Sequence, residues 1–248
     1  MAILYSKKTD AHHYQVRSAG QSIRLYSNGV LHSQYNPRQP INGAIWDLLL
    51  LPGFLLNTPP KRILLLGLGG GTLVHLIRQF FPLAHMTCIE LDKQHIAISK
   101  KWFKLPKKNV TLIEGDAYEF MRTTTNSFDW IVDDVFQHIN GEPERGTDIV
   151  SLWPLYKRCL NENSLLSLNV IGSQQKSQFN AIKSKFDLAY ELRHPLYSNQ
   201  ILNAIHGGGI QKLNKTEFLE KLSKFKELNQ GYKTCKLNYE FKVLKTNR

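Results

Sequence analysis

The sequence has few cysteines and no long apolar run. Cys88, Cys159 and Cys235 are its only three cysteines, and their wide separation argues against a disulfide framework or a zinc site. The longest apolar stretch, residues 44–56, is interrupted by Asp, Pro and Gly and falls short of a membrane span. Residues 1–10 also lack the layout of a signal peptide. These absences predict a soluble, cytoplasmic protein with reduced thiols.

Two signatures of other enzyme classes are missing as well. The sequence has no G-x-S-x-G turn to carry a nucleophilic serine. The neighbouring His12 and His13 would point to opposite faces of a strand, so they predict no metal site. Serine-hydrolase and metal-dependent chemistry are therefore not expected.

Acidic residues are scarce relative to basic ones. The chain carries 32 Lys and Arg against 20 Asp and Glu, a net charge of +12. Residues 172–248 hold 14 of these basic and 6 of these acidic side chains, which gives +8 in that segment alone. Such a region could face RNA, although a solvated, lysine-rich surface is the favoured interpretation. A nucleic-acid partner is thus an alternative that the composition does not favour.

Short apolar segments alternate with amphipathic ones through the middle of the chain. Strands are predicted at 61–66, 86–90, 110–113, 130–133 and 165–171, and helices at 72–81, 93–104, 116–121, 151–160 and 174–186. Because strand and helix alternate at short spacing, we predict an α/β fold with a mainly parallel sheet covered on both faces. Residues 188–194 and 200–206 are expected to end that sheet as an antiparallel pair.

The two ends of the chain depart from this alternation. Short strands at 13–18, 22–26 and 30–35 are predicted to form a small β-hairpin appendage, because Asn28-Gly29 between β-type runs is a strong hairpin signal. Near the C-terminus, an amphipathic helix at 215–228 is expected to begin at a capping box of Asn214 and Glu217.

These patterns predict three regions. The β-hairpin region covers residues 1–40. A Rossmann-like domain covers residues 41–210 and begins with an apolar helix at 41–51. A basic C-terminal helix and tail cover residues 211–248.

A glycine-rich turn follows the first strand of the alternating region. It reads LGLGGGT over residues 66–72, between a predicted strand and a predicted helix, where glycines let the backbone approach a ligand closely. The dinucleotide turn G-x-G-x-x-G does not fit, because its sixth position is Thr72. A tight βα turn without any ligand is the structural alternative.

Acidic residues follow three successive strands, at the edge where α/β sheets bind ligands. Glu90, roughly 20 residues past the glycines, is expected to accept hydrogen bonds from a ribose, whereas Asp92 is expected to cap a helix. Asp116 either accepts from the amine of adenine or caps the next helix. Asp133 and Asp134 follow the fourth strand, and only one of these neighbours should face a ligand. A sulfonium cation accounts for these acids better than a pyrophosphate does.

Four motifs resemble, in order and spacing, those of the spermidine synthase family. They are ILLLGLGGGTL (63–73), IELD (89–92), EGDA (114–117) and FDWIVDD (128–134). Trp102 and Phe103 resemble the aromatic pair that follows the family's second helix, and the N-terminal hairpins resemble its small β-domain. The resemblance covers residues 13–207 and implies the fold of class I S-adenosylmethionine-dependent methyltransferases.

The resemblance also implies roles for individual residues. The glycine turn would meet the amino-acid part of the donor, Glu90 the ribose, and Asp116 the adenine. Asp134, the expected catalytic residue, would lie beside the transferred group. The expected binding residues are Gly67, Gly69, Gly70, Gly71, Glu90, Leu91, Asp116, Ala117 and Asp134.

Several family positions differ in this chain. Polyamine-making members carry an aspartate where this chain has Gly69, a second aspartate at Gln137 and a glutamine at His32. Their acidic Tyr-His signature falls on residues 37–42, which contain no acid, tyrosine or histidine. A diamine needs carboxylates to pair with its ammonium groups and a base to free one amine, so these differences weaken aminopropyl transfer. They leave the nucleoside site intact.

We therefore expect a transferase that uses S-adenosylmethionine, or its decarboxylated form, and a small-molecule acceptor. Catalysis would rest largely on positioning the acceptor for displacement at the sulfonium. A methyltransferase-like activity is the favoured interpretation. Aminopropyl transfer to an amine and a non-catalytic nucleoside- or RNA-binding role are the alternatives. No membrane or metal partner is expected, and formation of a homodimer is left open.

Overall fold

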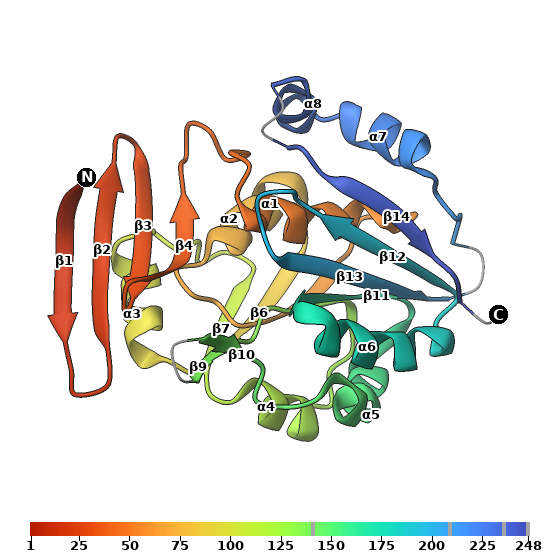
Figure 1. Ribbon diagram of the computed structural model, residues 1–248, viewed down its shortest axis with the longest axis horizontal. Coiled ribbons are helices and arrows are strands. Elements are labelled where there is room, and N and C mark those ends of the chain that lie inside the picture. The colour runs from red at the N-terminus through yellow and green to blue at the C-terminus, as the bar shows by residue number, and fades with distance from the viewer. Residues whose placement is uncertain (140–141, 208–209, 235–236, 247–248) are drawn as a thin grey trace.

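The protein has a small N-terminal sheet at one end and a larger sheet surrounded by helices (Figure 1). The computed structural model describes residues 1–139, 142–207, 210–234 and 237–246, and for residues 137–139 and 142–144 it describes the backbone alone. Within these segments, no helix combines the length and the apolar composition that crossing a membrane requires.

The N-terminal sheet is antiparallel, with the order β1-β2-β3-β4. Its strands are β1 (Ala2–Lys8), β2 (His13–Ala19), β3 (Ser22–Ser27) and β4 (Val30–Tyr35). The predicted hairpin is confirmed, because Asn28 and Gly29 have φ angles of 50° and 81°, as a two-residue connection requires. β1 escapes prediction from the sequence, since nearly all its side chains are exposed and no apolar alternation marks it.

The larger sheet has eight strands in the order β14-β12-β13-β11-β8-β5-β6-β7. The parallel strands are β5 (Arg62–Leu66), β6 (His85–Glu90), β7 (Val110–Glu114), β8 (Phe128–Asp133) and β11 (Leu160–Ile171). Antiparallel pairings add β12 (Leu188–Arg193), β13 (Asn199–His206) and β14 (Glu240–Leu244). The predicted Rossmann-like sheet with an antiparallel end is confirmed, and β14 is an edge strand beyond the prediction.

Helices lie on both faces of the larger sheet (Figure 1). They are α1 (Ile45–Leu50), α2 (Thr72–Phe80), α3 (Lys93–Lys101), α4 (Ala117–Thr123), α5 (Ile149–Cys159), α6 (Gly172–Ile182), α7 (Lys215–Ser223) and α8 (Lys226–Lys233), with 3₁₀ turns at Leu51–Leu55 and Lys183–Lys185. A short hairpin of β9 (Gln137–Ile139) and β10 (Glu142–Glu144) precedes α5. The first helix begins later than predicted, and Pro52 lies at the start of the 3₁₀ turn that follows it.

The C-terminal segment forms two helices and a strand in place of the single predicted helix. Its predicted capping box is confirmed: the Asn214 side chain accepts from the N–H of Glu217 at 3.0 Å, and the Glu217 carboxylate accepts from the N–H of Asn214 at 2.7 Å. α7 packs on the 3₁₀ turn at Leu51–Leu55, and β14 pairs with β12. The division of the chain near residues 40 and 210 stays a prediction.

Alternate residues of the central strands build two apolar layers. Ile63 and Leu65 of β5 belong to one buried cluster, whereas Leu64 and Leu66 belong to another. None of these four residues is more than 1% exposed. Because neighbouring side chains of a strand point to opposite faces, β5 is apolar throughout, as expected for a strand covered on both sides. This packing fixes the carboxyl ends of β5, β6 and β8, where the candidate site lies.

Candidate functional site

The glycine turn joins β5 to α2 at the carboxyl edge of the sheet. Gly67 has a φ angle of 86°, and a Cβ atom there would lie 2.5 Å from the backbone oxygen of Asp134. Both the conformation and the lack of space exclude any other residue at this position. The turn therefore lies against the chain that leaves β8, where the predicted catalytic acid is found.

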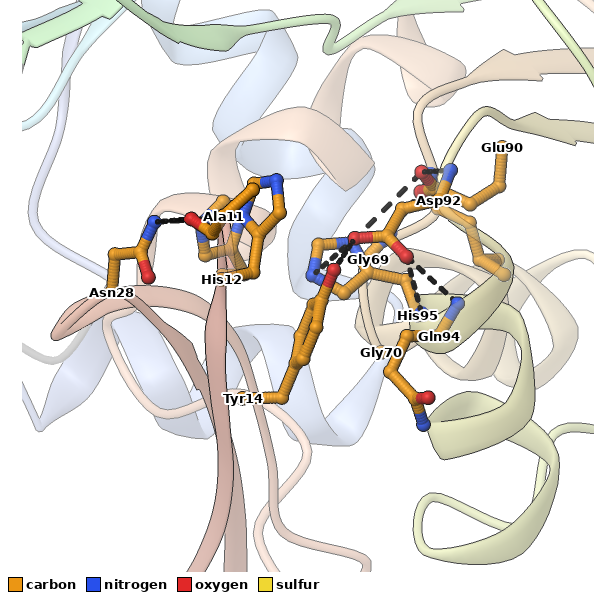
Figure 2. A network of polar contacts seen from close by, with 12 residues as sticks. Ala11, His12, Tyr14, Asn28, Gly69, Gly70, Glu90, Asp92, Gln94 and His95 are labelled. Atoms are coloured by element: carbon orange, nitrogen blue, oxygen red, sulfur yellow. Dashed lines mark hydrogen bonds and ion pairs between the residues drawn. The ribbon is translucent and has the colours of Figure 1, made fainter. Parts of the chain in front are cut away.

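Glu90 ends β6 and holds the glycine turn in place. Its Oε2 accepts hydrogen bonds from the N–H groups of Leu68 and Gly69, both at 2.9 Å. Its Oε1 accepts from the N–H of Asp92 at 2.9 Å. Figure 2 shows this carboxylate beside the turn, and the residue is only 8% exposed. The contact of Glu90 with a ribose stays a prediction.

Asp92 connects the same edge of the sheet to the N-terminal sheet. Its Oδ1 accepts from the N–H groups of Gln94 and His95 at 2.7 and 3.4 Å, so it caps α3 as predicted. Its Oδ2 accepts from the hydroxyl of Tyr14 at 2.8 Å, and Figure 2 shows that ring reaching across from β2. Burial and this hydrogen bond raise the pKa of Tyr14, which therefore stays protonated and donating at neutral pH.

Asp116 follows β7 and caps α4. Its Oδ1 accepts from the N–H groups of Tyr118 and Glu119 at 2.9 and 2.8 Å, which is the structural alternative that the sequence leaves open. Ala117 is the first residue of α4 and is 8% exposed, whereas Leu91, just after β6, is 59% exposed. The contacts of Asp116 and Ala117 with an adenine ring, and that of Leu91 with the donor, stay predictions.

Asp133 and Asp134 have different partners, as the geometry of a strand requires. Asp133 is fully buried and accepts hydrogen bonds from the guanidinium of Arg145, at 2.6 Å, and from the hydroxyl of Tyr156. Asp134 accepts instead from Nδ2 of Asn169 at 2.7 Å. Asp133 is thus committed to an interior ion pair, while Asp134 lies beside the glycine turn.

Asn169 of β11 orients the carboxylate of Asp134. Its Oδ1 accepts from Nδ2 of Asn199 at 2.9 Å, which leaves its own Nδ2 to donate to Asp134. Burial raises the pKa of Asp134 to about 7, the hydrogen bond from Asn169 opposes that rise, and the nearby charge of Asp133 adds to it. A carboxyl group with this pKa can take up or release a proton near neutral pH.

Arg145 belongs to this site, although sequence reasoning misses it. The residue follows β10, and its side chain is 1% exposed. Besides the ion pair with Asp133, it donates to the hydroxyl of Tyr118 at 3.0 Å and to the backbone oxygen of Asn169 at 2.7 Å. No periodicity or motif marks a single arginine in an irregular segment. Only the fold shows that it ties β8 to β11.

An acid outside the predicted set lies close to residues 37–42. Asp47 of α1 is fully buried, and its Oδ2 accepts from the N–H groups of Asn42 and Gly43 at 2.9 and 2.7 Å. Burial raises the pKa of Asp47 to about 7, against the effect of these hydrogen bonds. Residues 37–42 contain no acid of their own, but a carboxylate from α1 holds the backbone at the end of that segment.

The positions that depart from the family pattern lie in separate places. His32 is on β4, and its ring centroid lies 5.1 Å from that of His95. The ring of His95 in turn lies next to the carboxylate of Glu90. Gln137 is the first residue of β9, and its side chain lies outside the described part of the chain. As far as the described residues go, no three His, Cys, Asp or Glu side chains gather where they could hold a metal ion.

Comparisons with known proteins agree with one another. A model of the spermine/spermidine synthase domain matches residues 48–181. A polyamine aminopropyltransferase of Vibrio vulnificus is 33% identical over 98 residues, which cover 38% of this chain and 32% of that protein. A polyamine aminopropyltransferase of Neisseria meningitidis is 30% identical over 145 residues, which cover 57% of this chain and 53% of that protein. The crystal structure of a probable spermidine synthase from Corynebacterium glutamicum has a TM-score of 0.76 at 19% identity, over 98% of this chain and 91% of that one.

The extent of these similarities differs between sequence and structure. The chain spans from a third to a half of the length of these two aminopropyltransferases, 32% and 53%. The structural similarity extends over nearly the whole chain, and at 19% identity it concerns the fold alone. It includes the N-terminal sheet as well as the Rossmann-like sheet, because 98% of this chain is covered.

Proposed function

Because this chain belongs to the spermine/spermidine synthase domain family, we propose that it is a transferase that moves an aminopropyl group from decarboxylated S-adenosylmethionine to an amine. The relatives it matches are named polyamine aminopropyltransferases, which favours this alternative over the methyltransferase-like interpretation of the sequence. The differences at Gln137 and at residues 37–42 concern the acceptor side, so the amine need not be the family's own.

The observation that carries this proposal is the pair of carboxylates on either side of the glycine turn. β5 lies between β6 and β8 in the sheet, so Glu90, which ends β6, and Asp134, which follows β8, flank the turn that leaves β5. The N–H of Gly67 donates to the backbone oxygen of Ile89 at 3.0 Å, and the N–H of Asp134 donates to that of Leu66 at 2.9 Å. Carboxylates on both sides of the turn favour a ligand that carries positive charge, such as a sulfonium with an amine.

Asp134 is suited to the proton transfer that such a reaction needs. An amine attacks the carbon next to the sulfur only after losing its extra proton, and Asp134, with a pKa of about 7, can accept that proton. As the new C–N bond forms, the C–S bond breaks and its electron pair returns to sulfur, which leaves neutral methylthioadenosine. The hydrogen bond from Asn169 holds the carboxylate in one orientation during this step.

Binding of the donor tests the proposal directly. Decarboxylated S-adenosylmethionine at about 100 times its dissociation constant should stabilise the protein by roughly 2.7 kcal/mol, measured as a shift in thermal unfolding. Mass spectrometry should then detect methylthioadenosine when a panel of amines, putrescine included, is added. The proposal fails if neither this donor nor methylthioadenosine binds in calorimetry while NAD does.

Replacing Glu90 with Ala should weaken donor binding by on the order of 1.5–3 kcal/mol, because a charged acceptor is lost. The change also leaves three backbone N–H groups without their acceptor, so the free energy of unfolding should fall as well. Glu90→Gln keeps one acceptor oxygen for the backbone N–H groups but removes the charge. Comparing it with Glu90→Ala therefore separates the loss of donor affinity from the loss of stability. Glu114→Gln, at the exposed end of the neighbouring β7, is the matched control. Unchanged affinity in Glu90→Ala would show that this residue does not hold the nucleoside.

A further inference from the structure

Strand β4 of the N-terminal sheet is fastened directly to the glycine turn. The N–H of Gly70 donates to Oγ of Ser33 at 2.6 Å, and Oγ1 of Thr72 donates to the backbone oxygen of Gln34 at 3.1 Å. The hydroxyl of Ser33 in turn donates to the backbone oxygen of His32 at 2.5 Å. Ser33 is fully buried, so water does not compete for these bonds.

The contact between strand and turn leaves no room for a side chain on the turn. A Cβ atom at Gly69 would lie 2.8 Å from the backbone oxygen of His32 and 2.8 Å from Oγ of Ser33. A Cβ atom at Gly70 would lie 2.8 Å from Cβ of Ser33 and 2.7 Å from the ring of Phe103. β4 therefore occupies the space that a side chain on either glycine would need.

Each backbone N–H of the turn has an acceptor within the protein. Gly67 donates to Ile89, Gly71 donates to Leu68, and Gly70 donates to Ser33. The two remaining N–H groups, those of Leu68 and Gly69, donate to the carboxylate of Glu90. Glycine turns at the start of a helix usually bind anions through free N–H groups and the helix dipole. Here those groups are occupied, and Glu90 adds a negative charge next to them.

From these contacts we propose that Ser33 makes the site selective for a sulfonium donor that lacks a carboxylate. This inference rests on the proposed function and assigns a specificity-determining residue to it. S-adenosylmethionine differs from its decarboxylated form only by a carboxylate, and backbone N–H donors of such a turn would stabilise that group. Ser33 occupies the N–H of Gly70 and keeps it from that role. Repulsion from Glu90 acts in the same direction, because like charges at a short distance destabilise each other.

Calorimetric affinities for the two donors test this inference. The unmodified protein should bind decarboxylated S-adenosylmethionine about tenfold or more tightly than S-adenosylmethionine, the effect of about one charge-assisted hydrogen bond. Ser33→Ala frees the N–H of Gly70 and should reduce that ratio several-fold, through tighter binding of S-adenosylmethionine. Ser33→Cys, which keeps the size of the side chain but offers a weak acceptor, should act in the same direction.

The control and the possible outcomes separate this inference from the proposed function. Ser27→Ala changes another buried serine, on β3, and should leave the ratio unchanged. An equal ratio in the unmodified protein and in both Ser33 variants overturns the inference while the proposed function stands. A preference of the unmodified protein for S-adenosylmethionine overturns the inference as well. Binding of neither donor overturns the proposed function, and the inference with it.

Discussion

Replacing Asp134 with Asn should slow the transfer reaction by about 10²–10⁴-fold, the usual contribution of a general base. The amide of Asn can still accept the hydrogen bond from Asn169, so the fold and the donor site should remain. Affinity for the donor should therefore change only a few-fold. The measurement is a single-turnover rate with the acceptor that the amine panel identifies, together with the calorimetric affinity for the donor.

The pH dependence of this reaction follows from the same residue. Burial raises the pKa of Asp134 to about 7, so the carboxyl is protonated below that pH and ionised above it. A base acts in its ionised form, and the rate should accordingly rise with pH through about 7 and level off above it. In Asp134→Asn this limb of the profile should disappear.

Glu119→Gln is the control for this pair of measurements, because it removes a carboxylate that is 62% exposed on α4. Asp133→Asn is less suited, since it also disrupts the ion pair with Arg145. If Asp134→Asn keeps the full rate and the same pH profile, the site has no acid–base residue at this position. The non-catalytic nucleoside-binding alternative would then gain support.

The central sheet could be predicted from the sequence because its inner strands are largely apolar and end at turn residues or acids. β5, for example, is a run of Ile and Leu between Arg62 and the glycine turn. The rule that α/β sheets bind ligands at the carboxyl ends of their strands then placed Glu90 and Asp134 at the same edge of the sheet. Local pattern and global topology give the same answer in this part of the chain.

The break between α7 and α8 and the strand β14 could not be predicted, because the apolar spacing there is ambiguous. Phe218, Leu222 and Phe225 are spaced as on one continuous helix, so the end of α7 at Ser223 leaves no trace in the pattern. β14 lies at a sheet edge, where its partly exposed side chains give no clear alternation. An edge strand is defined by its partner, and the partner, β12, lies far away in the sequence.

In the candidate site, too, contacts between residues far apart in the sequence could not be predicted. Ser33 meets the glycine turn across 37 residues of sequence, and Asp134 meets Asn169 across 35. A motif marks residues that are close in sequence, whereas these pairs form only when β4 and β11 reach the sheet edge. The acids of the site were therefore predictable, while the residues that orient them were not.

Replacing Arg145 with Met should lower the free energy of unfolding by about 3–5 kcal/mol. Arg145 and Asp133 are 2.6 Å apart, and their side chains are 1% and 0% exposed. Without the guanidinium, the carboxylate of Asp133 is left in the interior with only the hydroxyls of Tyr118 and Tyr156 as side-chain donors. The hydroxyl of Tyr118 and the backbone oxygen of Asn169 lose a donor as well. Urea denaturation of the unmodified protein and of Arg145→Met at neutral pH measures this difference in the free energy of unfolding.

The chain offers a close control for this experiment. Arg122 and Glu119 form an ion pair with the same distance of 2.6 Å, but their side chains are 52% and 62% exposed. Arg122→Met should therefore cost at most about 1 kcal/mol, because water solvates the carboxylate that remains. Adding Asp133→Leu to Arg145→Met should recover part of the lost stability, since the unpaired charge is then removed. If Arg145→Met and Arg122→Met lower the free energy of unfolding equally, burial does not make the loss of the arginine more costly for Asp133 than for Glu119.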